Sequence, residues 1–416
     1  MTFAASELEL DITGIAHGGT FIARHEGRVV FVPDAIPGEL VRARISDASK
    51  SSFWRAETLE VLDASPHRRD HVWAEADVSR APEDRVGGAD LGHIALDHQR
   101  VLKHQVLQEA LDKFAGAGIG APAVEAVDRA DGTGQADGTG QADGTGQADG
   151  TRWRTRVSLH VDDAGRVGPF AARSHRVIDV SSLPLARPAI EEAAFALRSQ
   201  KPGRVDLVEP GDGRVRVLPR PEGARRGKSE TIVETVGGRR FRVEAGGFWQ
   251  VHPRAAETLH EAVGEALDGR VDANATHFDL YGGVGLFAAT LGEQGATDIV
   301  TVESDRRATE HALENLAAFD AQAVTARVDR FLTALPDGTR AGAVVLDPPR
   351  AGAGRGVVES IHGLDPDAVV YVACDPVALA RDLGTFRELG WDVTSLRAFD
   401  LFPHSHHFEA VALLTR

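Results

Sequence analysis

The feature that most constrains the fold is an alternation of short apolar runs and helical segments, from about residue 253 to the end of the chain. The apolar runs include HFDLY, DIVTVE, AGAVVLD and AVVYVAC, and segments with helical periodicity lie between them. This alternation predicts a doubly wound, mostly parallel sheet of the Rossmann-like kind. Ligands bind such sheets beyond the carboxyl ends of the strands, so the residues at those ends are the candidates for function.

A glycine turn and an acidic residue stand at the first two strand ends. HFDLY (277–281) runs into GGVG (282–285), and Glu303 ends the next strand, 20 residues after Gly283. Glycines let a backbone approach a ligand closely, and a carboxylate at Glu303 can accept hydrogen bonds from a ribose diol. The pair indicates an adenosine-containing ligand, although the turn lacks the G-x-G-x-x-G spacing of dinucleotide sites. The alternative is two ordinary strand ends.

The third strand ends in Asp347, followed by Pro348, Pro349 and Arg350. Two prolines fix an extended and rigid exit from the strand, which makes Asp347 a good ligand-positioning group. An aromatic residue after Asp-Pro-Pro would resemble enzymes that methylate amino groups on bases. Arg350 takes that place here, which disfavours amino methylation.

Cys374, the only cysteine of the chain, ends the fourth strand. Asp375 is a plausible N-cap and Pro376 a favoured first helical residue. The thiol is therefore expected at a helix N-terminus, where the helix dipole stabilises a thiolate. The alternative is a buried, inert cysteine.

The last motif is FPHSHHFE (402–409), which leads into the strand AVALLT. Its three histidines raise the alternative of a metal site, but His406 and His407 are adjacent and cannot easily share one tetrahedral ion. Glu409 begins a strand and is expected to face the same crevice as Cys374. A thiolate and a carboxylate suit methylation of uracil at carbon 5, because the thiolate can activate the ring by adding to carbon 6 and the carboxylate can then remove the carbon 5 proton.

The rest of the chain divides into three kinds of segment. Residues 6–62 alternate apolar and polar positions between turns and predict a small β-barrel, either purely structural or oligonucleotide-binding. A helix is expected from Leu91 to Phe114. Residues 130–151 repeat ADGTGQ with no apolar face and are expected to be a flexible insertion rather than a calcium-binding repeat. Residues 152–245 predict an antiparallel sheet.

The composition further limits the class of protein to which the chain can belong. With 416 residues, 42% hydrophobic and 26% charged, the chain is long enough for two or three domains with proper cores. One cysteine excludes an intrachain disulfide and a cysteine-rich zinc or iron–sulfur site. No run approaches a membrane span of about 20 residues, and the first residues do not resemble a secretory signal. A cytoplasmic protein is expected. The net charge of −16 argues against a generic nucleic-acid binder but leaves room for a local basic patch.

Taken together, the motifs resemble the RNA uridine-5-methyltransferases that carry an N-terminal TRAM domain, over nearly the whole chain apart from the repeat. The resemblance rests on FWQVHP (248–253), DLYGGVG (279–285), VESD (302–305), LDPPRAG (346–352), VACDP (372–376) and FPHSHHFE (402–409). It implies Cys374 as the nucleophile and Glu409 as the base. It also implies an S-adenosylmethionine site formed by Gln250, Tyr281, Glu303 and Asp347.

The resemblance assigns the β segment to a TRAM RNA-binding barrel (1–62), followed by a central segment (63–245) and a methyltransferase domain (246–416). Within the central segment, residues 153–156 and 174–175 resemble an RNA-contacting motif. Many members of the family hold an iron–sulfur cluster on a C-G-G-C segment and two further cysteines. Here the segment reads VGGA (86–89), and Leu183 stands where another ligand would be, so no cluster is expected. Leu286 and His252 also depart from common family residues.

The sequence thus predicts a monomeric enzyme that uses S-adenosylmethionine to methylate carbon 5 of a uridine in tRNA or rRNA. Two alternatives remain open. One is an amino-group methyltransferase acting on nucleic acid, which would leave Cys374 idle. The other is a non-catalytic RNA-binding protein, which would not explain why Glu303, Asp347, Cys374 and Glu409 all stand at strand ends.

Overall fold

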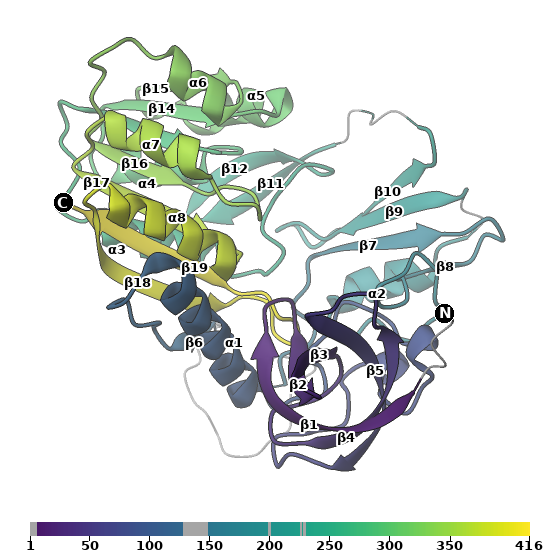
Figure 1. Cartoon of the computed structure of the whole chain (residues 1–416). Coiled ribbons are helices and arrows are strands. Elements are labelled where there is room, and N and C mark those ends of the chain that lie inside the picture. The colour runs from purple at the N-terminus through teal and green to yellow at the C-terminus, as the bar shows by residue number, and fades with distance from the viewer. Residues whose placement is uncertain (1–5, 128–148, 199–200, 225–226, 228–229) are drawn as a thin grey trace, which may run out of the picture.

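A computed structural model describes residues 6–127, 149–198, 201–224, 227 and 230–416. Figure 1 shows three regions: an N-terminal barrel, a central region, and a large C-terminal sheet with helices on both faces. Within the described ranges, no helix is long and apolar enough to cross a membrane.

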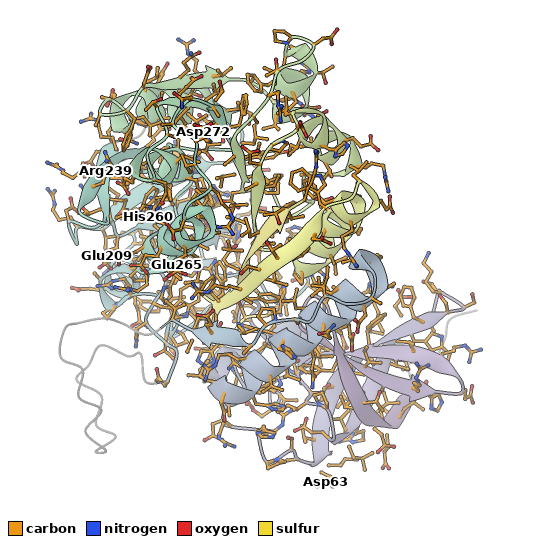
Figure 2. All side chains as sticks on the ribbon, turned by 90° about the vertical axis from the view of Figure 1, so that its left-hand side faces the viewer. Asp63, Glu209, Arg239, His260, Glu265 and Asp272 are labelled. Atoms are coloured by element: carbon orange, nitrogen blue, oxygen red, sulfur yellow. The ribbon has the colours of Figure 1, made fainter. Side chains whose placement is uncertain are left out.

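The N-terminal region is a closed five-stranded barrel with the strand order β1-β2-β3-β5-β4, as the alternating pattern predicts. Apolar side chains such as Leu10, Phe21 and Val30 fill its interior, and they are at most 1% exposed. Asp63, labelled in Figure 2, ends its last strand. The strands are β1 (Glu7–Ala16), β2 (Thr20–His25), β3 (Arg28–Val32), β4 (Leu40–Asp47) and β5 (Phe53–Asp63).

The central region contains a long helix and an antiparallel sheet of order β10-β9-β7-β8. The antiparallel arrangement confirms the prediction for residues 152–245. The predicted start of the helix at Leu91 is wrong, because the Leu91 amide donates to the His404 carbonyl in an irregular segment and the helix begins only at Leu96. The elements are η1 (Ala74–Ala76), η2 (Pro82–Asp84), α1 (Leu96–Ala110), η3 (Leu111–Ala115), β6 (Val124–Ala126), β7 (Arg156–Val161), β8 (Val167–Gly168), α2 (Pro188–Phe195), β9 (Gly203–Val208), β10 (Arg216–Pro221), β11 (Thr231–Val236) and β12 (Arg239–Glu244).

The C-terminal sheet has the order β15-β14-β13-β16-β17-β19-β18-β6. Strands β13 to β17 are parallel to one another, and β19 runs antiparallel between β17 and β18. The strands are β13 (Thr276–Leu280), β14 (Asp298–Glu303), β15 (Ala321–Thr325), β16 (Ala343–Leu346), β17 (Ala368–Ala373), β18 (Asp392–Asp400) and β19 (Glu409–Thr415). The doubly wound, mostly parallel prediction is confirmed.

Helices cover both faces of this sheet. One core cluster joins one face to α3, α4 and α5, and the other joins the opposite face to α1, α6, α7 and α8. Figure 2 labels His260 and Glu265 of α3, one of the helices that cover the first of these faces. The helices are α3 (Ala255–Leu267), α4 (Leu286–Glu293), α5 (Arg306–Asn315), α6 (Val328–Ala334), α7 (Arg355–Gly363) and α8 (Pro376–Glu388).

Most of the predicted insertion, residues 130–148, lies outside the described residues. The described residues continue from Asp149, before the expected end of the insertion at Thr151. The Asp149 carbonyl accepts a 2.7 Å hydrogen bond from His404 Nε2. Gly150 has a φ of +73°, and a Cβ there would meet Leu96 and His404. The expectation of a flexible segment is therefore wrong for residues 149–151.

Candidate active site

Cys374 and Glu409 meet at the end of two paired strands. Strand β17 ends at Ala373, β19 begins at Glu409, and the last pair between them is Ala373 with Ala410. Continuing this antiparallel register places Cys374 directly opposite Glu409. Cys374 is partly exposed, whereas Glu409 is 5% exposed. The strands therefore bring together the two residues for which the sequence predicts catalytic roles.

Asp347 lies beside this pair. It follows β16, which pairs with β17, and its backbone amide donates to the Leu280 carbonyl at 3.3 Å. Burial, with the neighbouring Asp279, raises the pKa of Asp347 to about 7. Burial and then Asp347 raise the pKa of Glu409 well above its ordinary value, and Arg350 opposes this shift. Three acidic groups and one guanidinium thus share this end of the sheet.

Asp375 caps α8 as the sequence predicts. Its carboxylate accepts hydrogen bonds from the backbone amides of Val377 and Ala378. The expected stabilised thiolate at Cys374 is, however, wrong for the free protein. Burial, followed by Glu409 and Asp347, raises the pKa of the Cys374 thiol to about 12 despite the opposing charge of Arg350. The carboxylates and the buried setting outweigh the helix terminus, so the thiol keeps its proton.

The three histidines before Glu409 have separate partners. His406 Nδ1 lies 2.7 Å from Asp90 Oδ2, His407 Nε2 lies 3.2 Å from Arg350 Nη2, and His404 bonds to Gln99 and Asp149. Burial, with His406 and Arg350, lowers the pKa of His407 to about 3, so its Nε2 accepts from Arg350. Among the residues that the structure describes, no group of three metal-ligating side chains converges.

Residues 400–404, which lead to Glu409, are held against α1 by contacts that were not predicted from the sequence. Lys103 Nζ lies 2.6 Å from Asp400 Oδ1 and 3.1 Å from the Phe402 carbonyl. Lys103 and Asp400 are only 2% and 3% exposed. Gln99, which is fully buried, bonds through its side chain to the His404 backbone amide and ring. The sequence feature that could have indicated these bonds is a lysine and a glutamine at positions where the helical pattern predicts apolar residues.

The glycine turn after β13 forms a cradle over a buried carboxylate. A Cβ on Gly282 would lie 2.0 Å from Thr301 Oγ1 and 2.5 Å from Asp279 Oδ2, so only glycine fits. Asp279 Oδ2 accepts from Thr301 and from the Ala288 amide of α4, while Oδ1 is buried with no hydrogen-bond partner among the described residues. Burial raises the pKa of Asp279 to about 7. No separate role was predicted for Asp279 from the sequence.

Glu303 lies at the edge of the same cradle. Its Oε2 accepts from the Gly283 amide at 3.3 Å, and its Oε1 accepts from Ser304 and from the Asp305 amide. These bonds fix the carboxylate at the end of β14, where it remains partly exposed. A close backbone approach and a fixed carboxylate fit an adenosine ligand bearing a ribose diol, and S-adenosylmethionine is such a ligand.

Tyr281 and Gln250 are the remaining predicted cofactor residues. Tyr281 follows β13 in a left-handed conformation with φ of +63°, and burial, with Asp329 and Asp382, raises its pKa to about 12. Gln250 belongs to the segment between β12 and α3, which Thr155 holds through two 2.9 Å hydrogen bonds to the Val251 carbonyl. Tyr281 therefore borders the cradle, whereas no described hydrogen bond joins Gln250 to the other candidates.

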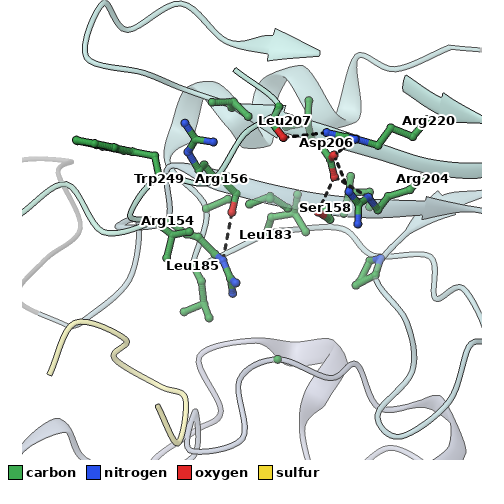
Figure 3. Close-up of a pocket in the computed structure, with 18 of the residues that line it drawn as sticks. Arg154, Arg156, Ser158, Leu183, Leu185, Arg204, Asp206, Leu207, Arg220 and Trp249 are labelled. Carbon is green, nitrogen blue, oxygen red and sulfur yellow. Dashed lines mark hydrogen bonds and ion pairs between the residues drawn. The ribbon is translucent and has the colours of Figure 1, made fainter. Parts of the chain in front are cut away.

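A cavity of about 410 Å³ lies between the central sheet and the segment before α3 (Figure 3). Four arginines line it, together with Phe248, which is 75% exposed. Arg204 and Arg220 pair with Asp206, while Arg156 donates to the Ala245 and Gly247 carbonyls. Arg154 Nε donates to the Arg156 carbonyl, as Figure 3 shows. The cavity thus contains the arginines of the predicted RNA-contacting motif, Arg154 and Arg156.

Two family models match the chain. The TRAM domain model matches residues 4–57, and the model described as tRNA (Uracil-5-)-methyltransferase matches residues 233–416. An uncharacterized RNA methyltransferase of Streptomyces avermitilis is 38% identical, over 98% of both chains. A 23S rRNA (uracil(1939)-C(5))-methyltransferase of Shewanella piezotolerans is 28% identical, over 98% of this chain and 96% of that protein.

Among solved structures, the chain resembles a tRNA (uracil-54, C5)-methyltransferase of Pyrococcus abyssi in complex with S-adenosyl-L-homocysteine. The TM-score is 0.69 at 21% identity, with 98% of this chain and 100% of that chain covered. At this identity the likeness shows that the two proteins share a fold.

Proposed function

The chain belongs to the TRAM-containing tRNA (uracil-5-)-methyltransferase family and is an S-adenosylmethionine-dependent RNA methyltransferase, and from this premise we propose that it methylates carbon 5 of a uridine through a covalent Cys374–uracil intermediate. The observation that carries the proposal is the opposed placement of Cys374 and Glu409 at the ends of β17 and β19.

Methylation at carbon 5 requires a nucleophile and a base that act on the same uracil ring. Cys374 Sγ forms a bond to carbon 6 of uracil, and the displaced ring electrons make carbon 5 nucleophilic. Bound S-adenosylmethionine supplies the electrophilic methyl group that carbon 5 accepts. Glu409 then removes the carbon 5 proton, the ring double bond re-forms, and the bond to Cys374 breaks. Because the free protein favours the protonated thiol, Cys374 must pass its proton to solvent water as the reactive complex assembles.

The raised pKa of Glu409 suits the role of base. A carboxylate with an ordinary pKa is a weak base at neutral pH, whereas burial beside Asp347 makes the ionised form of Glu409 a stronger base, which must have lost its own proton before it takes the one from carbon 5. In the proposed site, Glu303 binds the ribose of the cofactor, and Tyr281, Gln250 and Asp347 bind its remaining parts. The buried, unpartnered Oδ1 of Asp279 supports a polar ligand at the adjoining turn.

The alternatives from the sequence are less well supported. The family and its relatives are RNA methyltransferases, so the chain is an enzyme and the non-catalytic interpretation is set aside. For amino methylation, the aromatic platform after Asp-Pro-Pro is absent, because Arg350 stands there and donates to His407. The proposed substrate is tRNA or rRNA, and we propose that the protein works as a monomer in the cytoplasm.

The product identifies the reaction. RNA from a strain lacking this gene, incubated with the purified protein and cofactor labelled in its methyl group, should yield labelled 5-methyluridine on nucleoside mass spectrometry. Label on an exocyclic amino group would contradict the proposal. Separating tRNA from rRNA before digestion identifies the substrate class.

A further inference from the structure

The barrel reaches the active site through the turn between β1 and β2. His17 lies in this turn, and its Nε2 is 2.9 Å from Asp375 Oδ2. Asp375 directly follows Cys374 in the chain. The side chains are 43% and 18% exposed, so the contact is partly shielded from water. It joins a residue of the first domain to the residue next to the proposed nucleophile.

Asp375 uses its two oxygens for different elements. Oδ1 accepts from the Val377 amide at 3.0 Å and the Ala378 amide at 2.8 Å, which caps α8, while Oδ2 contacts His17. Burial would raise the pKa of Asp375, but the hydrogen bonds from His17 and the helix amides hold it below its ordinary value. The carboxylate is thus ionised and held from two sides. This arrangement limits how the backbone beside Cys374 can rotate.

The same turn also lies close to the segment before Glu409, at Gly19. Gly19 is buried with φ of +70°, and a Cβ there would lie 3.0 Å from both Asp90 Cβ and His406 Cβ. Asp90 and His406 are themselves paired at 2.7 Å. A close approach that leaves no space for a side chain indicates a fitted interface.

We propose that His17 is a positioning residue for methyl transfer, which holds Asp375 and, through it, Cys374, so that the TRAM barrel completes the active site as well as binding RNA. The proposal rests on the proposed function for the role of Cys374. It assigns the barrel an effect on the rate of the chemical step, separate from its effect on RNA affinity.

The test is a double-mutant cycle on methyl transfer to total RNA from a strain lacking the gene. The variants are His17→Ala, Asp375→Asn and the double substitution, with His17→Gln for rescue. Asn caps a helix as well as Asp does, so Asp375→Asn keeps the cap on α8, changes the contact with His17 and removes a negative charge beside Cys374. The matched control is His98→Ala, since the His98 ring stacks on His67 at 3.8 Å and no described contact joins it to Asp375 or Cys374.

For His17→Ala we expect kcat to fall about three- to tenfold, the size of a partly exposed charge-assisted bond. KM for RNA and Tm should stay near those of the unmodified protein, as should every parameter of His98→Ala. His17→Gln should recover most of kcat, because its amide can donate to Asp375. The double variant should be no slower than the slower single variant.

Several results would overturn the inference: additive losses in the cycle, a loss confined to KM, or His17→Gln as slow as His17→Ala. The assay counts every transferred methyl group, so it separates the two proposals. If the double-mutant cycle shows coupling but the product is not 5-methyluridine, only the proposed function is refuted. If the product is 5-methyluridine but the cycle shows no coupling, only the role of His17 is refuted.

Discussion

The buried ion pair between Lys103 and Asp400 predicts a large and pH-dependent effect of Lys103→Met. Both residues are 3% exposed or less, and the pair holds the segment that leads to Glu409. Removing the lysine leaves a buried carboxylate without its cation, which typically costs about 3–5 kcal/mol. The carboxyl can avoid this cost by binding a proton. At pH 7, protonating a carboxyl with an ordinary pKa of 3.9 costs about 4 kcal/mol. We therefore expect a loss of about 3–4 kcal/mol at neutral pH.

The sign of the pH dependence follows from the same argument. In Lys103→Met, burial without a partner cation favours the neutral form of this carboxyl in the folded protein. A raised carboxyl pKa favours the folded state below the unfolded pKa, and this benefit is lost as pH rises through the folded pKa. The deficit relative to the unmodified protein should thus shrink to about 1–2 kcal/mol at pH 5.

Urea unfolding followed by tryptophan fluorescence at both pH values measures these differences. The matched control is Lys103→Met combined with Asp400→Leu, because replacing both members of a buried pair with apolar residues is often nearly neutral. The reasoning is refuted if the single variant loses as much stability at pH 5 as at pH 7. It is equally refuted if the double variant is no more stable than the single one.

Three further predictions concern the cofactor, the repeat and the thiol. Glu303→Ala should weaken S-adenosylmethionine binding by about 1.5–3 kcal/mol, measured by calorimetry, and unchanged affinity would remove that assignment. Deleting residues 130–148 should leave activity and Tm nearly unchanged, whereas a deletion extended through Asp149–Thr151 should lower Tm, because His404 loses its carbonyl partner. Alkylation of Cys374 should be slow at pH 8 and still rising at pH 10, and Glu409→Gln should accelerate it at pH 10, because the Glu409 carboxylate opposes formation of the thiolate there. An alkylation rate that levels off below pH 9 would contradict the raised pKa.

The fold and the strand-end residues could be predicted because both depend on local patterns. Apolar runs alternating with helices specify a parallel sheet, and parallel strands gather their carboxyl ends at one edge. Asp347 and Cys374 could therefore be singled out from their positions alone, whereas Glu409, which begins the antiparallel strand β19, is singled out by its motif and the family resemblance. The N-cap role of Asp375 could also be predicted, since it needs only neighbouring residues.

The properties that depend on contacts between distant segments could not be predicted. The pKa of Cys374 is set by burial and by carboxylates on two other strands, which outweigh the local effect of the helix terminus. The Lys103–Asp400 pair joins residues 297 positions apart. His17 lies in the first domain, and nothing in its local sequence indicates that its partner follows the cysteine.

The most direct test of the account is to trap the covalent intermediate. Glu409→Gln removes the base but keeps the thiol, so addition and methyl transfer can proceed while elimination stalls. With labelled RNA and labelled cofactor, this variant should give a protein–RNA adduct that survives a denaturing gel and carries the methyl group. Adding Cys374→Ala should abolish the adduct. Methylation of RNA by Cys374→Ala would contradict both the nucleophile and the carbon 5 chemistry, whereas normal turnover by Glu409→Gln would contradict the assignment of the base.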